Sequence, residues 1–331
     1  MTDPATLADY HRRLLSDRRR CEVLRRALSE VVVVGQSVVA DIGAGTGLLG
    51  VLAALAGARR VVLYEREPLA AAWAEEFVAL RGLADRISIY PEDVRYVLDP
   101  EPADIVVSET LGNLGPDEGI VALLDDARRR YLRPGGRMLP ESLELVLAPV
   151  SSAALHHEIA GWVAEADLPL DVTKIRDLAL GNAYVRRLAR TELVAWPSPE
   201  RIWTKYDFLR DGPQPRAGVA VWEAPVAAAV HGFAHYWRAR FAGQILTTSP
   251  ADPPTHWEQV YLPLPEPLEL LPGERLELRI AGDFDAGAEP FGQGPGIALE
   301  WEARAYDPAG SLRGGWSCGV GGPPAPLDFQ K

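Results

Sequence analysis

VVADIGAGTGLLGVLAAL, residues 38–55, joins an apolar strand pattern to an apolar helix pattern through a glycine-rich turn. Gly43, Gly45 and Gly47 allow the main chain to turn tightly and to approach a ligand closely, because they carry no Cβ. Backbone amides at the start of the following helix favour a negatively charged group. This stretch therefore predicts a nucleotide-type binding loop between a buried strand and a helix.

Strand and helix patterns alternate through the residues around this loop. Strands are predicted at 38–43, 60–65, 86–90 and 103–109, and helices at 47–57, 68–82 and 119–132. Strands interleaved with helices of this length imply a parallel, doubly wound sheet. Ligands of such sheets bind at the carboxyl ends of the strands. We therefore expect a Rossmann-like domain over residues 36–145.

The sequence changes character after the Rossmann-like region. Prolines become frequent, and short alternating segments such as RLELRIAG and ALEWEARAY follow one another, which predicts an antiparallel β domain over 146–331. Residues 155–183 read as a helical excursion from that domain. Leucines spaced on one face predict a helix over 5–29, so residues 1–35 form a separate helical segment.

Composition excludes several classes of protein. The chain has 331 residues, 34 basic against 46 acidic, and a formal net charge of −12, so nucleic acid and anionic membrane are unfavourable partners. Cys21 and Cys318 are too few for a disulfide framework or a cysteine-based zinc site. The N-terminus becomes charged before any apolar run, and no apolar stretch reaches the ~18 residues of a spanning helix. We therefore expect a cytoplasmic protein.

The spacing of the glycines distinguishes two kinds of cofactor. The dinucleotide fingerprint G-x-G-x-x-G needs glycine where this chain has Leu48. The spacing here is G-x-G-x-G after Asp41, which is typical of S-adenosylmethionine (SAM) methyltransferases. Glu65 ends the second strand, where a carboxylate can accept both ribose hydroxyls. Asp93 and Val94 follow the third strand, where they can contact adenine, so the whole context predicts a SAM site.

The fourth strand runs into SETLGNLGPDE (108–118), in which Glu109 and Glu118 stand nine positions apart. Glycines and Pro116 allow this loop to fold back and bring the carboxylates together. Two ionised carboxylates repel each other unless a cation lies between them, and a guanidinium matches them with a planar fork of donors. A guanidinium, with a pKa of ~13, is a poor nucleophile that such carboxylates can orient and polarise. The alternative is an ordinary polar surface loop.

These segments resemble the signature motifs of the protein arginine N-methyltransferase family. SETLGNLGPDE is similar to the family's double-glutamate loop, THWEQ (255–259) to its second signature, and LLSDRRR (14–20) to the segment that closes over the cofactor. LAPVSS (147–152) and HGFAHYW (231–237) resemble the type II branch, which makes symmetric dimethylarginine, whereas THW resembles the type I branch. The resemblance runs from Tyr10 to near the end of the chain, with the motifs in the family's order.

The resemblance implies roles for individual residues. Glu109 and Glu118 would bind the guanidinium, with Trp257 as a wall of the substrate channel. His256 would pair with Asp17, orient the site and carry away a proton. The residues that would bind SAM are His11, Arg20, Asp41, Gly43, Gly45, Glu65, Asp93, Val94 and Glu109, with Arg20 on the SAM carboxylate. Leu14 stands where type I enzymes carry methionine and type II enzymes phenylalanine, a position that influences the product.

The resemblance also implies an overall architecture. It is an α/β fold in which a Rossmann-like SAM-dependent methyltransferase domain precedes an antiparallel β-barrel domain. Family members dimerise through a helical arm, for which 155–183 is the candidate, and we expect a homodimer. The apolar residues that this arm could not bury alone are Ile159, Trp162, Val163, Leu168 and Leu170.

The sequence thus predicts a SAM-dependent arginine N-methyltransferase that needs neither a metal ion nor nicotinamide. Free L-arginine is the favoured substrate, because the N-terminus is short and accessory domains are lacking. In this respect the chain resembles the enzyme of streptozotocin biosynthesis that makes N-omega-methyl-L-arginine. The alternatives are a protein or peptide arginine methyltransferase and, more remotely, a small-molecule O-methyltransferase. An NAD-dependent oxidoreductase is disfavoured by Leu48.

Overall fold

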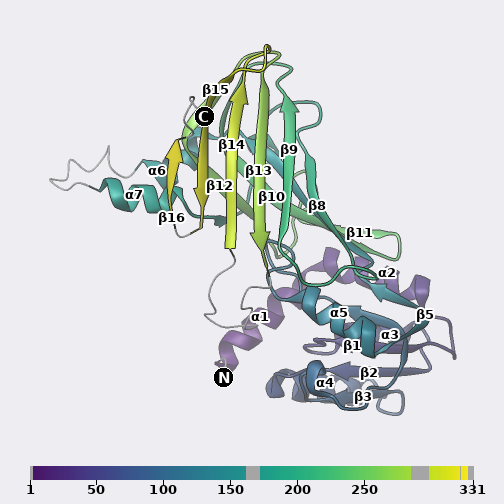
Figure 1. Ribbon diagram of the computed structural model, residues 1–331. Coiled ribbons are helices and arrows are strands. Elements are labelled where there is room, and N and C mark those ends of the chain that lie inside the picture. The colour runs from purple at the N-terminus through teal and green to yellow at the C-terminus, as the bar shows by residue number, and fades with distance from the viewer. Residues whose placement is uncertain (1–2, 162–171, 285–297, 321, 327–331) are drawn as a thin grey trace.

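The computed structural model describes residues 3–161, 172–284, 298–320 and 322–326. A parallel-sheet domain lies below a tall antiparallel β domain, as Figure 1 shows. Two helices from the N-terminus, α1 (Pro4–Ser16) and α2 (Arg18–Val31), lie where the two domains meet (Figure 1). None of the helices in these ranges is long and apolar enough to cross a membrane.

The lower domain is built on a five-stranded parallel sheet in the order β3-β2-β1-β4-β5. Its strands are β1 (Val38–Ile42), β2 (Arg60–Tyr64), β3 (Ile87–Tyr90), β4 (Ala103–Ser108) and β5 (Leu132–Leu139). The helices are α3 (Leu48–Leu55), α4 (Pro68–Leu80), the short 3-10 helix η1 (Val94–Tyr96) and α5 (Ile120–Arg130). The predicted Rossmann-like sheet is confirmed, with every predicted strand and helix present.

The helix predicted over 5–29 is two helices instead of one. Asp17 leaves the helical region with φ −75° and ψ 91°, and its Oδ1 accepts a hydrogen bond from the backbone N–H of Arg20 at 2.9 Å. Asp17 therefore ends α1 and caps α2, because its carboxylate satisfies an amide that has no partner inside the helix. The break allows α1 to lie over the carboxyl edge of the parallel sheet.

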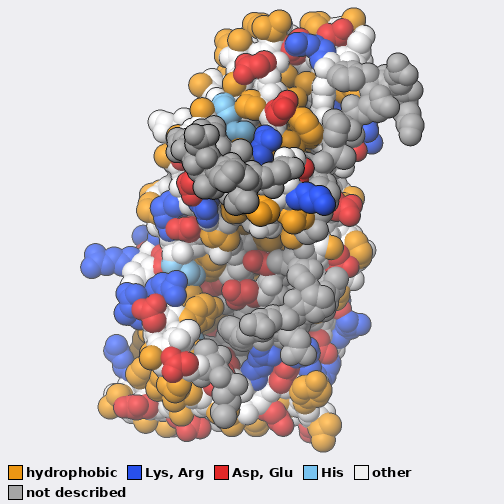
Figure 2. Space-filling view, turned by 90° about the vertical axis from the view of Figure 1, so that its left-hand side faces the viewer, with side chains coloured by type: hydrophobic (Ala, Val, Ile, Leu, Met, Phe, Trp, Pro, Cys, Tyr) orange, Lys and Arg blue, Asp and Glu red, His pale blue; other side chains and the backbone are white. Residues whose placement is uncertain are grey.

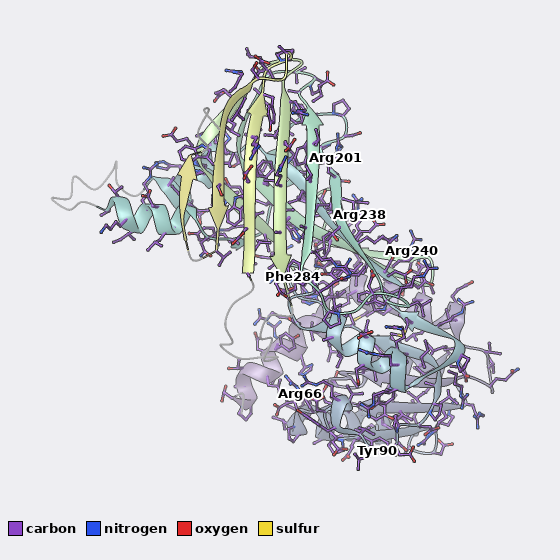
Figure 3. The ribbon with its side chains drawn as sticks, in the orientation of Figure 1. Arg66, Tyr90, Arg201, Arg238, Arg240 and Phe284 are labelled. Carbon is purple, nitrogen blue, oxygen red and sulfur yellow. The ribbon has the colours of Figure 1, made fainter. Side chains whose placement is uncertain are left out.

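The upper domain consists of two antiparallel sheets, in the orders β7-β12-β10-β6-β8, with β11 beside β10, and β16-β15-β14-β13-β9. Its strands are β6 (Ser142–Val150), β7 (Tyr184–Arg186), β8 (Arg201–Asp207), β9 (Arg216–Glu223), β10 (Ala228–Phe241), β11 (Gln244–Thr247), β12 (Gln259–Leu270), β13 (Arg275–Asp283), β14 (Ala298–Tyr306), β15 (Leu312–Gly319) and β16 (Gly322–Pro326). Trp222 of β9 stacks on Phe233 of β10, with ring centroids 5.9 Å apart, and so joins the sheets through their shared core. Phe284, just after β13, lies at the end of this domain nearest the parallel sheet (Figure 3).

The predicted arm begins and ends in helices that lie beside the β domain (Figure 1). These are α6 (Ala153–Ala160) and α7 (Thr173–Leu180), and the short 3-10 helix η2 (Arg190–Glu192) follows β7. Ile159 is buried against the β domain, whereas Ile175 and Leu178 of α7 are 55% and 52% exposed. The other apolar residues named for the arm, Trp162, Val163, Leu168 and Leu170, lie outside the described residues.

Candidate active site

A cavity of about 650 Å³ lies at the carboxyl edge of the parallel sheet, under α1. Its walls come from α1, from the loops that follow β1, β2, β3 and β4, and from the beginning of α5. The volume is typical of small-molecule sites, which range over ~300–1,000 Å³. Figure 2 shows acidic side chains gathered in a recess at the waist of the molecule, between the two domains.

The glycine loop after β1 is shaped by Gly43 and Gly45, which line the cavity. Their φ angles of 68° and 55° lie in the left-handed region, where a Cβ would strain the backbone. A Cβ on Gly45 would also lie 2.9 Å from Cε1 of His11, so glycine leaves room for this imidazole. Burial and the charge of Arg20 lower the pKa of His11, which keeps the ring neutral. The ring packs edge-on against Trp73 of α4, with centroids 5.9 Å apart, and so holds α1 over the loop.

Glu65, directly after β2, lines the cavity as predicted. Its Oε2 accepts a hydrogen bond from the N–H of Gly45 at 2.6 Å, and its Oε1 accepts one from the N–H of Glu67 at 2.7 Å. Burial raises the pKa of Glu65, and these amides oppose that effect. The carboxylate is therefore fixed beside the glycine loop, at a position where it could accept ribose hydroxyls. Arg66, the next residue, lies between α1 and the sheet (Figure 3).

Asp41 lies beneath the glycine loop rather than on the cavity wall. It is 0% exposed in β1, and its Oδ2 accepts a hydrogen bond from the N–H of Gly50 in α3 at 2.8 Å. Its Oδ1 has no partner among the described residues, and burial raises the pKa of Asp41 to about 7. Among these residues it does not line the cavity. Asp41 therefore ties strand to helix under the loop, and its part in SAM binding stays a prediction.

Asp93 and Val94, after β3, both line the cavity. Two hydrogen bonds from Arg95 hold the Asp93 carboxylate, from Nε to Oδ1 at 2.9 Å and from a terminal nitrogen to Oδ2 at 2.6 Å, and they lower the pKa of Asp93. Val94 is buried, and its carbonyl accepts a hydrogen bond from the Tyr131 hydroxyl at 2.7 Å. The polar and apolar walls expected around an adenine ring are thus both present.

Arg130, the last residue of α5, holds this part of the wall in place, although the sequence pattern did not reveal that role. Its guanidinium donates to the carbonyls of Val94 and Arg95, both at 3.1 Å, and to the carbonyl of Val97. Asp126, one turn earlier on α5, accepts from the same guanidinium at 3.1 Å. The arginine therefore fixes the turn that carries the predicted adenine contacts.

Arg20 and Glu109 form a buried ion pair on the cavity wall, with side chains 7% and 3% exposed. Two guanidinium nitrogens of Arg20 donate to Oε2 of Glu109, and the N–H of Leu111 donates to Oε1 at 3.3 Å. Burial opposes the charge of Arg20, but the carboxylate keeps the pKa of Arg20 raised. The carbonyl of Leu14, which also lines the cavity, accepts from Arg20 at 3.3 Å. The predicted SAM-carboxylate ligand thus also anchors one of the two glutamates.

Glu118 lines the same cavity, but its hydrogen bonding differs from that of the ion-paired residues and its pKa is raised. Its carboxylate forms no hydrogen bond or ion pair within the described part of the chain. Burial, together with the nearby charges of Asp117 and Glu109, raises the pKa of Glu118 to about 8. The two predicted guanidinium ligands therefore face one cavity, but Glu109 is held by a cation and Glu118 is left for a ligand.

The double-glutamate loop is held from above by the β domain. Three groups bind consecutive loop residues: the Trp257 indole N–H donates to the Leu111 carbonyl at 2.6 Å, the Trp237 indole N–H to the Gly112 carbonyl at 2.9 Å, and the Glu258 N–H to Oδ1 of Asn113 at 2.9 Å. The two indoles meet edge to face, with centroids 4.9 Å apart. These contacts span well over a hundred residues of chain, so no local pattern predicts them.

The predicted pair of His256 with Asp17 is confirmed as a contact. Oδ2 of Asp17 lies 2.9 Å from Nδ1 of His256 and accepts from its backbone N–H at 2.8 Å. Burial opposes ionisation of Asp17, but these bonds and the N–H of Arg20 hold its pKa below the ordinary value. The pair joins the α1–α2 junction to the loop before β12. The His256 ring lies 3.7 Å from the ring of Trp257, measured between centroids.

Three of the predicted site residues lie behind the cavity wall. Within the described residues, Asp17, His256 and Trp257 are not part of the cavity wall. Trp257 is only 5% exposed, because its indole packs against the double-glutamate loop. The geometry gives all three a positioning role, whereas the wall itself includes two unpredicted residues, Tyr10 of α1 and Asp117. Adjacency to His11 and to Glu118 was the available signal for these two.

The donor set of the cavity fits SAM. The cavity is lined by a neutral imidazole, a glycine loop with room for a close approach, a carboxylate at the expected ribose position and the wall expected for adenine. Arg20 supplies a guanidinium near the glycine loop, where a carboxylate of the ligand can approach it. Clusters of three or more His, Cys, Asp or Glu side chains that could hold a metal ion do not occur among the described residues.

Comparison with known sequences agrees with this geometry. The sequence model of the ribosomal protein L11 methyltransferase (PrmA) family matches residues 24–140, about a third of the chain. A probable protein arginine N-methyltransferase 6 of Arabidopsis thaliana is 26% identical over 303 residues, which cover 78% of this chain and 69% of that protein. A probable histone-arginine methyltransferase CARM1 of Oryza sativa subsp. indica is 31% identical over 259 residues, and there this chain spans about half the relative, 48%.

Solved structures show the same fold. A Trypanosoma brucei PRMT1 enzyme–prozyme heterotetrameric complex with AdoHcy matches with a TM-score of 0.79 and 23% identity, over 94% of this chain and 98% of that one. Arabidopsis thaliana protein arginine methyltransferase 10 matches with a TM-score of 0.76 and 19% identity, over 94% and 97%. The agreement covers both domains in one arrangement. The chain is thus similar in sequence to curated arginine methyltransferases and shares the fold of solved protein arginine methyltransferase structures.

Proposed function

We propose that the protein is a SAM-dependent N-methyltransferase that acts on a terminal guanidinium nitrogen of arginine. One observation carries this proposal: Glu109 and Glu118 face the same cavity as the glycine loop and Glu65. A SAM site alone would not need two loop carboxylates beside it. An O-methyltransferase, the more remote alternative, has no cationic group for them to bind.

The two glutamates of the cavity would have different roles in such a methyl transfer. Bound SAM supplies an electrophilic methyl group. Glu109, fixed by Arg20, offers a rigid carboxylate, and Glu118, which has no partner among the described residues, would bind the guanidinium from another side. The pair concentrates the positive charge on the nitrogens that it binds and leaves another nitrogen facing the methyl donor. The contribution of the protein is mainly orientation and electrostatic stabilisation.

For the substrate we propose free L-arginine, converted to N-omega-methyl-L-arginine in bacterial natural-product biosynthesis. The cavity volume of about 650 Å³ is in the range of small-molecule sites, which supports a small substrate beside the cofactor. Peptide-bound arginine is the second candidate, and the names of the relatives favour it, because they describe protein and histone arginine methyltransferases.

One assay separates these candidates. The full chain is incubated with SAM and an equimolar mixture of L-arginine and a Gly-Arg-rich peptide, and both products are quantified by mass spectrometry. We expect N-omega-methyl-L-arginine as the main product. Methylation of the peptide alone would establish the second candidate. A protein that binds S-adenosylhomocysteine in calorimetry and methylates neither compound would refute arginine methylation itself.

We also propose three parts with separate tasks and a homodimer. Residues 1–35 cover the cofactor, 36–145 bind it, and 146–331 hold the substrate loop. Within the last part, 155–183 would pack on the SAM domain of a second copy. Ile175 and Leu178 of α7 support this, because both are more than half exposed on a short helix. A clean monomer in light scattering at micromolar concentration would contradict the dimer.

A further inference from the structure

Asp117, immediately before Glu118, has a position that the proposed reaction leaves unexplained. Its carboxylate is folded back over Gly112 in the double-glutamate loop, where a Cβ on that glycine would lie 2.3 Å from Oδ1 and 2.4 Å from Oδ2. Oδ1 is buried and has no hydrogen-bond partner among the described residues. The position also lines the cavity. A buried carboxylate with an unsatisfied oxygen is costly, so its presence calls for a reason.

The loop is shaped around this carboxylate. Gly112 and Gly115 exchange backbone hydrogen bonds at 3.1 Å in both directions, which closes a tight turn. The N–H groups of Asn113, Leu114 and Gly115 in that turn favour the charged form of Asp117, in the manner of an anion-binding nest, although burial is the larger effect and raises its pKa to about 6. Glu118 follows without an intervening residue, so the direction of its side chain depends on where Asp117 is held.

We propose that Asp117 is a positioning residue of the guanidinium pocket: it fixes the turn that sets Glu118 opposite Glu109, and its negative charge strengthens the pocket's hold on a cationic substrate. This inference rests on the proposed function. The groups that face Glu118 are Glu109 with its partner Arg20, Asp117 itself, and Tyr10 from α1. Only Asp117 adds a negative charge that no cationic side chain of the described residues neutralises.

The two roles predict separate effects. Asp117→Asn keeps the shape and removes the charge, so binding of the guanidinium should weaken on the order of tenfold above pH 8.5, where Glu118 is ionised. Below pH 7 the loss should be smaller, because removing the charge also makes Glu118 easier to ionise. Gly112→Ala keeps the charge and displaces the carboxylate, so turnover should fall while the pH at which activity rises stays that of the wild type.

The experiment measures kcat/KM for arginine against pH in the wild type and both variants, with Asp85→Asn, an exposed position before β3, as the matched control. Calorimetric binding of L-arginine to the S-adenosylhomocysteine complex at pH 7 and 9 gives a second readout that needs no turnover. For Asp117→Asn we expect kcat/KM to begin its rise at a lower pH than in the wild type and to reach a lower maximum at high pH. The charge role would be overturned if the kcat/KM profile of Asp117→Asn matched that of the wild type. It would also be overturned if both variants lost kcat/KM equally while their activity rose at the wild-type pH. Wild-type binding without turnover would count against the proposed function alone.

Discussion

The two ends of the cavity are built in different ways. The cofactor end comes largely from the loops after β1, β2 and β3, where the predicted ligands Gly43, Gly45, Glu65, Asp93 and Val94 follow their strands closely, and His11 and Arg20 join them from α1 and α2. The guanidinium end depends on Trp237, Trp257 and Glu258, which reach the double-glutamate loop from the β domain. Local sequence thus shapes one end, and distant contacts shape the other. Variants of the two ends should therefore fail in different ways.

The largest effect should come from Glu109→Gln. It removes a guanidinium ligand and also leaves Arg20 as a buried cation without its carboxylate. We expect turnover to fall by more than a thousandfold and the protein to lose about 3–5 kcal/mol of unfolding free energy. Denaturant titration and the turnover assay check this together. A variant that is inactive but fully stable would show that the ion pair contributes little to folding.

Glu118→Gln should be nearly as inactive without the loss of stability. Its carboxylate has no partner in the described structure, so the amide removes only a group that can ionise to bind the cation. We expect turnover to fall by roughly a hundredfold to a thousandfold, the range seen when one electrostatic group of an active site is removed. Binding of S-adenosylhomocysteine should stay within about twofold. Near-normal turnover would show that the loop is ordinary surface.

The pH profile should show the ionisation of Glu118. Its pKa of about 8 means that the carboxyl is protonated in the free enzyme at neutral pH, so kcat/KM should rise about tenfold per pH unit and level off above 8. Stability should change in the opposite direction. The folded state keeps a proton that the unfolded chain releases near 4.5, so this contribution is full below 4.5 and lost as pH rises through 8. An acid limb near 4.5 would disprove the raised pKa.

Trp257→Phe tests whether the β domain shapes the guanidinium end from a distance. It keeps an aromatic ring and removes the indole N–H that binds the Leu111 carbonyl. We expect kcat to fall by about tenfold, since a buried carbonyl loses its donor and the loop shifts. Cofactor affinity should not change. The matched variant Trp196→Phe removes an indole N–H that bonds elsewhere in the β domain, to the Val226 carbonyl, and should leave kcat unchanged.

Arg130→Met should give the smallest effect, and only at the cofactor end. It breaks the bonds that hold the carbonyls of Val94, Arg95 and Val97. We expect the Kd for S-adenosylhomocysteine to rise by about fivefold, with kcat at saturating SAM unchanged. Arg128→Met on the same helix, whose guanidinium pairs with Asp125, is the control for loss of a cation. If Arg130→Met lowered kcat and left the Kd for S-adenosylhomocysteine unchanged, the cofactor and guanidinium ends would not act separately.

Most of the fold could be predicted because its signals are periodic and local. The predicted strands and helices of the parallel-sheet domain follow from hydrophobic patterns of four to thirteen residues. Two elements differ from the prediction: Asp17 divides the helix over 5–29 by capping α2, which a periodic pattern does not reveal, and β5 was not among the predicted strands. In the site, Glu65, Asp93 and Val94 were found through their position after a strand. Asp41, which lies within β1 ahead of the glycine loop, bonds to α3 under that loop and is not among the described residues that line the cavity.

The sequence by itself determined the order of the elements, the glycine loop, and which residue types lie at the carboxyl edge of the sheet. These depend on alternation of apolar residues and on the missing Cβ of glycine, both of which act within a few residues. The tertiary structure decided that Glu109 is paired with Arg20, that Glu118 has no partner among the described residues, and that Trp257 and His256 stand behind the cavity. Burial and charge at a site depend on what other segments bring to it, and only folding places those segments side by side.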